Sequence, residues 1–237
     1  MRDNLVEQRQ AAGETGMSEQ LRLYSYWRSS AAYRVRIGLN LKGLAYETLP
    51  VHLVRDGGEQ HQPEYAAVNP QQLVPTLMHG VRVVRQSLAI LEYLDEAWPS
   101  PRLLPMTARD RARVRGLAQL VACDIHPLNN LRVLRYFEQT WRVPQSERDE
   151  WTRHWIGEGF QAMEALLAGD PATGTFCHGQ SPGLADCCLV PQVFNARRFD
   201  VDMTSFPTIS RIEAACLELP AFIDARPDRQ PDAQQPA

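Results

Sequence analysis

The chain changes its pattern at Pro99-Ser100-Pro101. Before this point, short apolar runs with strand-like alternation are interspersed with helical segments. After it, apolar residues recur every three or four positions. Two prolines so close together end any helix or strand that reaches them, so the segment predicts a linker. The sequence therefore predicts an α/β domain over residues 20–99 and an all-helical domain over residues 105–228.

Strand-like segments in the first part are recognised by apolar alternation and by aromatic or β-branched residues. They are Leu21–Trp27, Ala45–Leu53, Leu73–Met78 and Val81–Val84. A helix is expected at Leu88–Trp98 with Ser87 as its N-cap, and the polar loop 55–72 is expected to contain one helical turn.

Residues 30–42 fit two structures. Arg34 to Leu41 alternates as a strand does, whereas the serines before it and Gly43 after it are typical of a helix N-cap and C-cap. The cap residues favour a helix. The order of elements in the first part is then β-α-β-α-β-β-α.

Apolar residues at helical spacing predict the helices of the second part. These span Leu117–Leu134, Trp151–Leu167, Leu184–Phe199 and Ile209–Leu219. Pro127 lies within the first helix and should kink it, because proline removes a backbone hydrogen bond. The chain ends are polar, and we expect a disordered extension at residues 1–19 and a flexible tail at residues 229–237.

Composition excludes several classes of function. The 25 basic and 28 acidic residues give a net charge of −3, which argues against nucleic acid as a partner. No apolar run approaches the ~18 residues of a membrane-spanning helix. The cysteines number 5, an odd count, and they lack the spacing of a metal site. A reducing, cytoplasmic location without a bound metal is the simplest interpretation.

Two serine turns are candidate binding sites. Ser29-Ser30 and Gln86-Ser87 each lie between a strand end and a helix start. Backbone amides at a helix N-terminus attract anions, and a serine hydroxyl can donate a hydrogen bond to them, although either pair could serve as an N-cap alone. Val74-Pro75 opens a strand, and its peptide bond could be cis or trans.

Five strings carry a family resemblance. They are Tyr24-Ser-Tyr-Trp-Arg-Ser-Ser30, Tyr33-Arg-Val-Arg-Ile37, Asn69-Pro-Gln-Gln-Leu-Val-Pro-Thr76, Gln86-Ser-Leu-Ala-Ile90 and Leu189-Val-Pro-Gln-Val193. The chain resembles the zeta-class glutathione transferases over about residues 20–230. The resemblance implies a thioredoxin-like N-terminal domain, a helix at 30–42, a cis bond at Val74-Pro75, an all-helical C-terminal domain and a homodimer.

The resemblance also implies glutathione as the cofactor. Ser29 would face the glutathione sulfur, with Ser30 beside it. The backbone of Val74 would pair with the cysteinyl part of the tripeptide.

The other implied glutathione contacts lie further along the chain. Gln86 and Ser87 would hold the γ-glutamyl end, and Gln60 would reach the glycyl end. His126 and Asn130 would approach from the second domain or from a partner subunit.

The activity implied by the resemblance is the cis–trans isomerisation of maleylacetoacetate to fumarylacetoacetate, a step in aromatic amino acid catabolism. A thiolate adds to the cis double bond, the resulting single bond rotates, and the thiolate leaves. Ser29, Ser30 and Arg28 would be the catalytic residues. Because the substrate is a small cis-dicarboxylic keto acid, we expect Arg28, Arg132 and Arg198 to hold its carboxylates.

Three other functions remain open at this point. A maleylpyruvate isomerase would perform the same chemistry on a shorter diacid, and a general glutathione S-transferase would conjugate foreign electrophiles. A non-catalytic glutathione-binding protein is the third.

The sequence departs from the family pattern at two positions. Ala31 stands where zeta-class enzymes commonly have a cysteine, so a cysteine there cannot be essential in this protein. Gly183 stands where the family has a serine or threonine N-cap, three residues before Asp186. Glycine is a tolerable cap, so we expect a small stability cost. Cys187-Cys188 is expected in the core, and Arg34 is a weaker site candidate.

Overall fold

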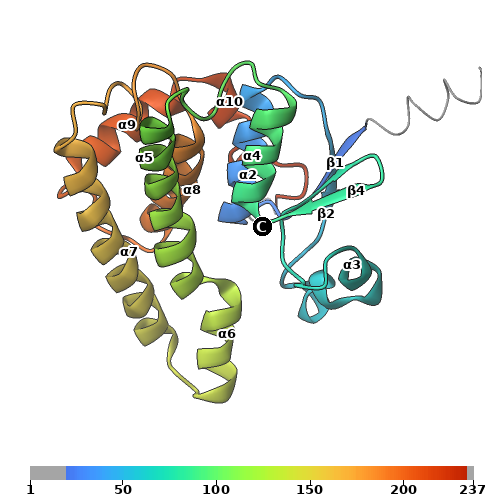
Figure 1. Cartoon of the computed structure of the whole chain (residues 1–237). Coiled ribbons are helices and arrows are strands. Elements are labelled where there is room, and N and C mark those ends of the chain that lie inside the picture. Colours follow the sequence, from blue (N-terminus) through green and yellow to red (C-terminus); the bar gives the residue numbers. More distant parts are fainter. Residues whose placement is uncertain (1–19, 234–237) are drawn as a thin grey trace, which may run out of the picture.

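A computed structural model describes residues 20–233. The N-terminal half contains a four-stranded mixed sheet in the order β2-β1-β3-β4. Strand β1 (Leu21–Ser25) is parallel to β2 (Glu47–Pro50) and antiparallel to β3 (Thr76–His79), which is antiparallel to β4 (Arg82–Arg85). The order of strands and helices confirms the predicted thioredoxin-like domain (Figure 1).

Strands β1, β2 and β3 are shorter than the sequence predicted, whereas β4 has the predicted length and lies one residue later. β1 ends at Ser25 because the chain turns at once, with the amide of Ser29 donating to the carbonyl of Tyr26 at 2.9 Å. β3 begins at Thr76, directly after the Val74–Pro75 bond, which is cis as expected. Ser100–Pro101 is also cis, which the sequence did not indicate.

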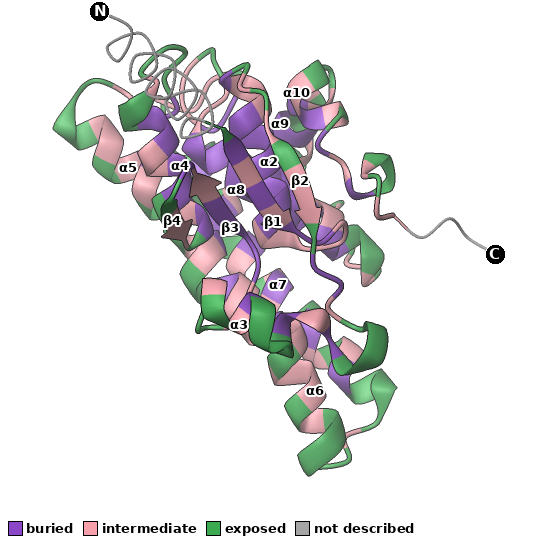
Figure 2. Cartoon of the chain, turned by 90° about the vertical axis from the view of Figure 1, so that its right-hand side faces the viewer, coloured by how far each residue is buried: buried purple, intermediate pink, exposed green. Residues whose placement is uncertain are grey.

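Residues 30–41 form helix α2 (Ser30–Leu41), which confirms the expectation based on the cap residues. The Ser29 hydroxyl accepts a hydrogen bond from the amide of Ala32 at 3.2 Å, and Gly43 follows the helix with a φ of +64°. All residues from Ala32 to Leu39 are buried, because α2 lies between the sheet and the helical half (Figures 1 and 2). A helix that is covered on both sides has no solvent-exposed face. Its apolar residues therefore do not follow the spacing of an amphipathic helix, and the sequence pattern was ambiguous.

Helix α4 (Ser87–Ala97) covers the same face of the sheet as α2. The prediction of Ser87 as its N-cap was wrong. The cap position is Gln86, whose φ is 71°, and no side chain caps the helix there. The Ser87 hydroxyl instead accepts a hydrogen bond from Nη1 of Arg34 at 3.1 Å. Between β2 and β3 lies the short helix α3 (Pro63–Val68), in the expected loop.

The C-terminal half is helical, as predicted. Its helices are α5 (Ala108–Gln119), α6 (Leu131–Thr140), α7 (Gln145–Ala168), α8 (Leu184–Arg198), α9 (Pro207–Leu217) and α10 (Pro220–Ile223). Cys187 and Cys188 are fully buried in its core, as expected. Tyr33, Ile37 and Leu91 of the N-terminal half belong to the same apolar cluster.

The segment 117–134 is not one kinked helix. Helix α5 ends at Gln119, Leu120–Ile125 forms a π-helical turn, and His126–Asn129 forms a 3-10 turn before α6 begins. Pro127 lies in that 3-10 turn and lacks the amide that would continue an α-helix. The side chain of Asn130 caps α6 by accepting from the amide of Arg132 at 3.1 Å. The break turns His126 and Asn130 toward the N-terminal half.

The linker between the halves is fastened to α2 and α4. Lys42, the only lysine in the chain, pairs with Asp95 at 2.6 Å and donates to the carbonyls of Trp98 and Pro101. Asp95 also accepts from the amides of Leu103 and Leu104. Buried charges are stable only when paired and hydrogen-bonded in this way.

The ends of the chain are described in part. The predicted extension at residues 1–19 lies outside the described residues. Of the predicted tail at 229–237, the structure describes residues 229–233, and Asp232 accepts a hydrogen bond from the amide of Trp27 at 2.9 Å. Within residues 20–233, no helix has the length and apolar character needed to cross a membrane.

Candidate functional site

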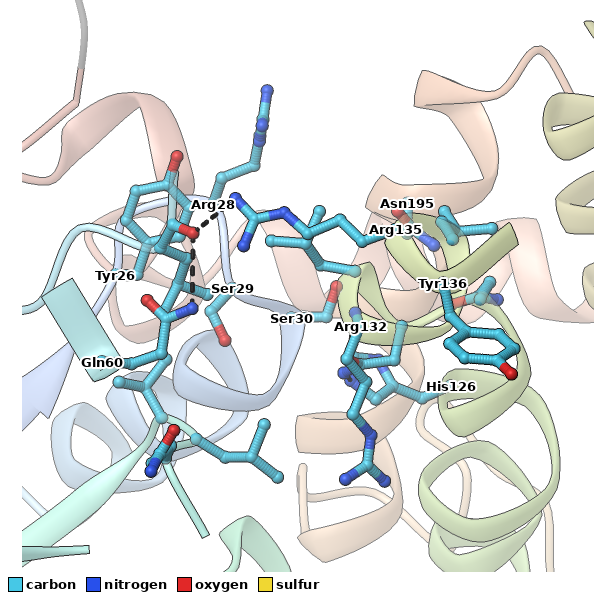
Figure 3. Close-up of a pocket in the computed structure, with 18 of the residues that line it drawn as sticks. Tyr26, Arg28, Ser29, Ser30, Gln60, His126, Arg132, Arg135, Tyr136 and Asn195 are labelled. Atoms are coloured by element: carbon cyan, nitrogen blue, oxygen red, sulfur yellow. Dashed lines mark hydrogen bonds between the residues drawn. The ribbon is translucent and has the colours of Figure 1, made fainter. Parts of the chain in front are cut away.

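A cleft of about 470 Å³ lies between the two halves. Its N-terminal wall is formed by the turn after β1, by the loop before α3 and by the segment before β3, and its other wall by residues 126–139 and the end of α8 (Figure 3). Most of the predicted site residues line it: Arg28, Ser29, Ser30, Gln60, Val74, His126, Asn130, Arg132 and Arg198. Side chains distant in sequence therefore line one cleft.

Gln86 and Ser87 do not line this cleft. They line an adjoining cavity of about 220 Å³, which shares Val74, His126 and Asn130 with the cleft. The structure therefore places the second serine turn next to the first site, at the N-terminus of α4. A ligand longer than a single amino acid could extend from one cavity into the other along the segment before β3.

Ser29 combines a hydroxyl with a helix N-terminus. Its oxygen accepts from the amide of Ala32, which leaves the hydroxyl hydrogen available to a ligand. The start of α2 also carries a partial positive charge that attracts an anionic ligand, because the first amides of a helix have no hydrogen-bond partner within it. Ser30 lines the same cleft one residue further on. This corner of the cleft is suited to an anion or a thiolate.

His126 and Asn130 form a pair on the opposite wall. The Nδ2 of Asn130 lies 3.3 Å from Nε2 of His126, and the Oδ1 of Asn130 accepts from the amide of Arg132. Burial lowers the pKa of His126 to about 3, and the positive charges of Arg34 and Arg132 act in the same direction. His126 is therefore a neutral hydrogen-bonding group at neutral pH, because its pKa lies far below 7.

Three predicted arginines give the cleft its positive charge. Arg28, Arg132 and Arg198 line it, and within residues 20–233 none of them forms an ion pair with an acidic side chain. Desolvation lowers the pKa of Arg198, and the positive charge of Arg28 lowers it further. Cationic side chains that line one cleft without acidic partners among the described residues form a site for an acidic ligand.

The lining residues that the sequence did not indicate include Tyr26, Arg135, Tyr136 and Asn195. Helical spacing could have indicated two of them, because Arg135 follows Arg132 by three positions and Asn195 precedes Arg198 by three. The Nη2 of Arg135 donates to the carbonyl of Leu53 at 2.9 Å (Figure 3). Leu53 O also lies 3.5 Å from Nε2 of Gln60.

Buried polar atoms without a protein partner indicate a polar ligand. Among the described residues these include Oε1 of Gln60, Nδ1 of His126 and both Nε and Nη2 of Arg34. An unmade buried hydrogen bond costs about 1–3 kcal/mol, so a ligand that completes these bonds would be stabilised in the cleft and the adjoining cavity. The set contains donor nitrogens and one acceptor oxygen, so it suits a ligand that carries both anionic groups and N–H groups, as a peptide does. No cluster of three or more His, Cys, Asp or Glu side chains suited to a metal occurs within residues 20–233.

Comparison with known proteins agrees with the fold and the site. Residues 23–102 match the family model described as the N-terminal domain of glutathione S-transferase. The sheet, the serine turn at the start of α2, the cis bond before β3 and the helical second half define the glutathione transferase class.

Individual relatives narrow the class. A probable maleylacetoacetate isomerase of Vibrio cholerae is 52% identical over 211 residues, covering 89% of this chain and 97% of the relative. The holo structure of a bacterial zeta-class maleylpyruvate isomerase has a TM-score of 0.87 at 51% identity, covering 90% of this chain and 100% of that one. A maleylacetoacetate isomerase of Methylobacterium extorquens AM1, with bound malonate and glutathione, has a TM-score of 0.87 at 42% identity and the same coverage. The chain belongs to the zeta class of the glutathione transferase family.

Proposed function

We propose that the cleft isomerises maleylacetoacetate to fumarylacetoacetate with glutathione as its cofactor. One observation supports this most strongly. Arg28, Arg132 and Arg198, which have no acidic partners within residues 20–233, line the same cleft as a helix N-terminus capped by the Ser29 hydroxyl. A dianionic substrate and a thiolate would then be held in the same cleft. Relatives with this activity by name cover nearly the whole described chain.

The glutathione contacts are assigned from position. Ser29 and Ser30 would hold the cysteinyl sulfur, and the Val74 backbone its peptide group. Gln60 would bind the glycyl end, where its Oε1 has no hydrogen-bond partner among the described residues.

The remaining glutathione contacts come from the adjoining cavity and the second wall. Gln86 and Ser87, at the α4 N-terminus, would hold the γ-glutamyl end. His126 would donate from Nδ1, and Asn130 holds the imidazole in place.

Bound glutathione would supply a thiolate that adds reversibly to the cis double bond, so that rotation about the resulting single bond becomes possible. The Ser29 hydroxyl and the partial positive charge at the α2 N-terminus lower the pKa of a thiol placed there. The glutathione thiol would then be ionised, and so nucleophilic, at neutral pH.

The arginines of the cleft act on the substrate. A guanidinium binds a carboxylate through two parallel hydrogen bonds, so Arg28, Arg132 and Arg198 can hold both ends of a diacid. Their positive charge also stabilises the negative charge that develops on the conjugated carbonyl during addition. The arginines that bind the substrate would therefore also lower the activation free energy of thiolate addition.

A maleylpyruvate isomerase is the second candidate, because the zeta-class relative with that name is 51% identical. Purified protein is mixed with glutathione and either maleylacetoacetate or maleylpyruvate, and the fumaryl product is followed by absorbance. A higher kcat/KM for maleylacetoacetate is expected. A higher value for maleylpyruvate would reverse the substrate assignment, and conjugation of a haloarene without turnover of either diacid would indicate a general transferase.

We also infer a homodimer, a cytoplasmic location and domain boundaries at residues 20–99 and 105–228. All 5 cysteines are free thiols, in agreement with a reducing compartment. Light scattering coupled to size-exclusion chromatography tests the dimer, and a mass near 26.8 kDa would contradict it.

A further inference from the structure

The turn that carries Arg28 is held from outside the cleft. Tyr26 to Ser29 form a tight turn, closed by the hydrogen bond from the Ser29 amide to the Tyr26 carbonyl at 2.9 Å, with Trp27 and Arg28 at its centre. Both backbone polar groups of Trp27 are bound by distant side chains. Its carbonyl accepts from Nη2 of Arg36 at 3.0 Å, and its amide donates to Oδ2 of Asp232 at 2.9 Å.

Arg36, which binds the Trp27 carbonyl, is held by several further hydrogen bonds. It is fully buried, and its Nη1 also donates to the Ser25 hydroxyl at 3.1 Å and reaches the Tyr26 carbonyl at 3.4 Å. Its Nε donates to the carbonyl of Ala225 at 2.9 Å. One guanidinium thus connects the end of β1, the turn and the C-terminal segment.

Asp232, which binds the Trp27 amide, lies among the last described residues of the chain. The segment after α10 lies beside α2 (Figure 1), which brings a side chain 205 positions away in sequence against Trp27. Gln230 holds this segment by donating to the carbonyls of Asp224 and Arg226, each at 2.9 Å. A carboxylate accepting from a backbone amide forms a charge-assisted hydrogen bond, which is stronger than a neutral one.

We propose that Asp232 is a positioning residue for the reaction, acting through Trp27 to hold Arg28 in the orientation that binds the substrate carboxylate. This inference rests on the proposed function of the cleft. Arg28 lies at the centre of the turn, adjacent to the bond that Asp232 makes, whereas Ser29 is also fixed by its place at the start of α2. Loss of the Asp232 contact should therefore disturb Arg28 more than Ser29.

The kinetic test compares two substitutions at one position. Asp232→Ala removes the acceptor and should raise the KM for the maleyl substrate about fivefold while changing the KM for glutathione less than twofold. Asp232→Asn retains an acceptor oxygen and should restore most of the loss. Asp228→Ala is the matched control, because Asp228 lies in the same segment and its one ion pair among the described residues is with Arg226.

A double-mutant cycle separates positioning from a general loss of structure. In an Arg28→Ala background, Asp232→Ala should have no further effect on the substrate KM, because its effect passes through Arg28. An equal effect in both backgrounds, or equal rises in both KM values, would overturn the proposal. Thermal unfolding of each variant shows whether the fold is retained. Inactivity of the unaltered chain contradicts the proposed function, whereas an active chain indifferent to Asp232→Ala contradicts this inference alone.

Discussion

Asn130 determines which nitrogen of His126 carries the proton. The Oδ1 of Asn130 accepts from the backbone amide of Arg132, so its Nδ2 is the group that faces Nε2 of His126. An amide nitrogen only donates, so Nε2 must accept and the imidazole proton must lie on Nδ1. That N–H is buried and has no partner among the described residues, which leaves it for the ligand.

The low pKa of His126 predicts that stability is lost in acid. Its pKa is about 3 in the folded protein against 6.5 as the ordinary value, so between these values the unfolded chain binds a proton that the folded chain does not. The contribution of His126 is complete above pH 6.5 and declines as pH falls toward 3, by up to about 1.4 kcal/mol per pH unit. Urea unfolding between pH 7 and pH 4 measures this loss.

The matched variant for this measurement is His126→Gln, which keeps a polar side chain without a titrating ring. Its stability should depend less on pH across the same range. If the unaltered protein and the His126→Gln variant lost stability equally as the pH falls, titrating groups other than His126 would be responsible for the loss.

Arg28→Ala should raise the KM for the diacid at least tenfold and change the KM for glutathione much less. The reason is that Arg28 lines the cleft and, in the described part of the chain, has no acidic partner, so its charge is available to a substrate carboxylate. Steady-state kinetics with each reactant varied in turn gives both constants. Arg153→Ala, an exposed position on α7, is the control. Equal rises in both constants would show that Arg28 does not hold the substrate.

Lys42→Ala should destabilise the protein by about 3–5 kcal/mol, because it leaves Asp95 as an unpaired buried charge. The side chain of Lys42 is 0% exposed and that of Asp95 is 5% exposed. Arg55→Ala removes a surface pair with Glu59 and should cost less than about 1 kcal/mol. Chemical unfolding of both variants makes the comparison, and similar losses would mean that burial does not govern the contribution of these pairs.

Gly183→Ser should destabilise the protein, although serine is usually the better N-cap. A Cβ at this position would lie 2.7 Å from the carbonyl oxygen of Leu103, so the linker would have to move, at a cost of about 1–3 kcal/mol. Gly116→Ala in the middle of α5 meets nothing within 4 Å and should stabilise by up to about 1 kcal/mol. A rise in the thermal midpoint for Gly183→Ser would show that the missing cap outweighs the close approach.

The same glycine shows where sequence reasoning was limited. The resemblance to the family showed that Gly183 lacks the N-cap hydroxyl of a serine or threonine. Asp186 nevertheless makes its half of the capping interaction, because its carboxylate accepts from the Gly183 amide at 2.8 Å. The closeness of Leu103 could not be predicted, because it depends on the path of the linker. Local signals such as the Ser29 cap were sufficient to predict α2 correctly.

The site was predictable where its motifs are contiguous and less so where distant segments meet. Arg34 and Arg36 on α2 have the sequence character of surface residues, yet both are buried, and Arg36 donates to a carbonyl 189 positions away. Ser87 illustrates the same limit. Its position before an apolar helix indicated a cap, but its hydroxyl is bound by Arg34 from another element.

The apolar cluster that unites the two halves determines how the chain can unfold. Tyr33 and Ile37 of α2 and Leu91 of α4 belong to the core of the helical half, so separating the halves would expose that core to water. The α/β half and the helical half should therefore melt together, as one cooperative transition. Because the cleft is formed between the two halves, we expect the site to be lost in this same single transition.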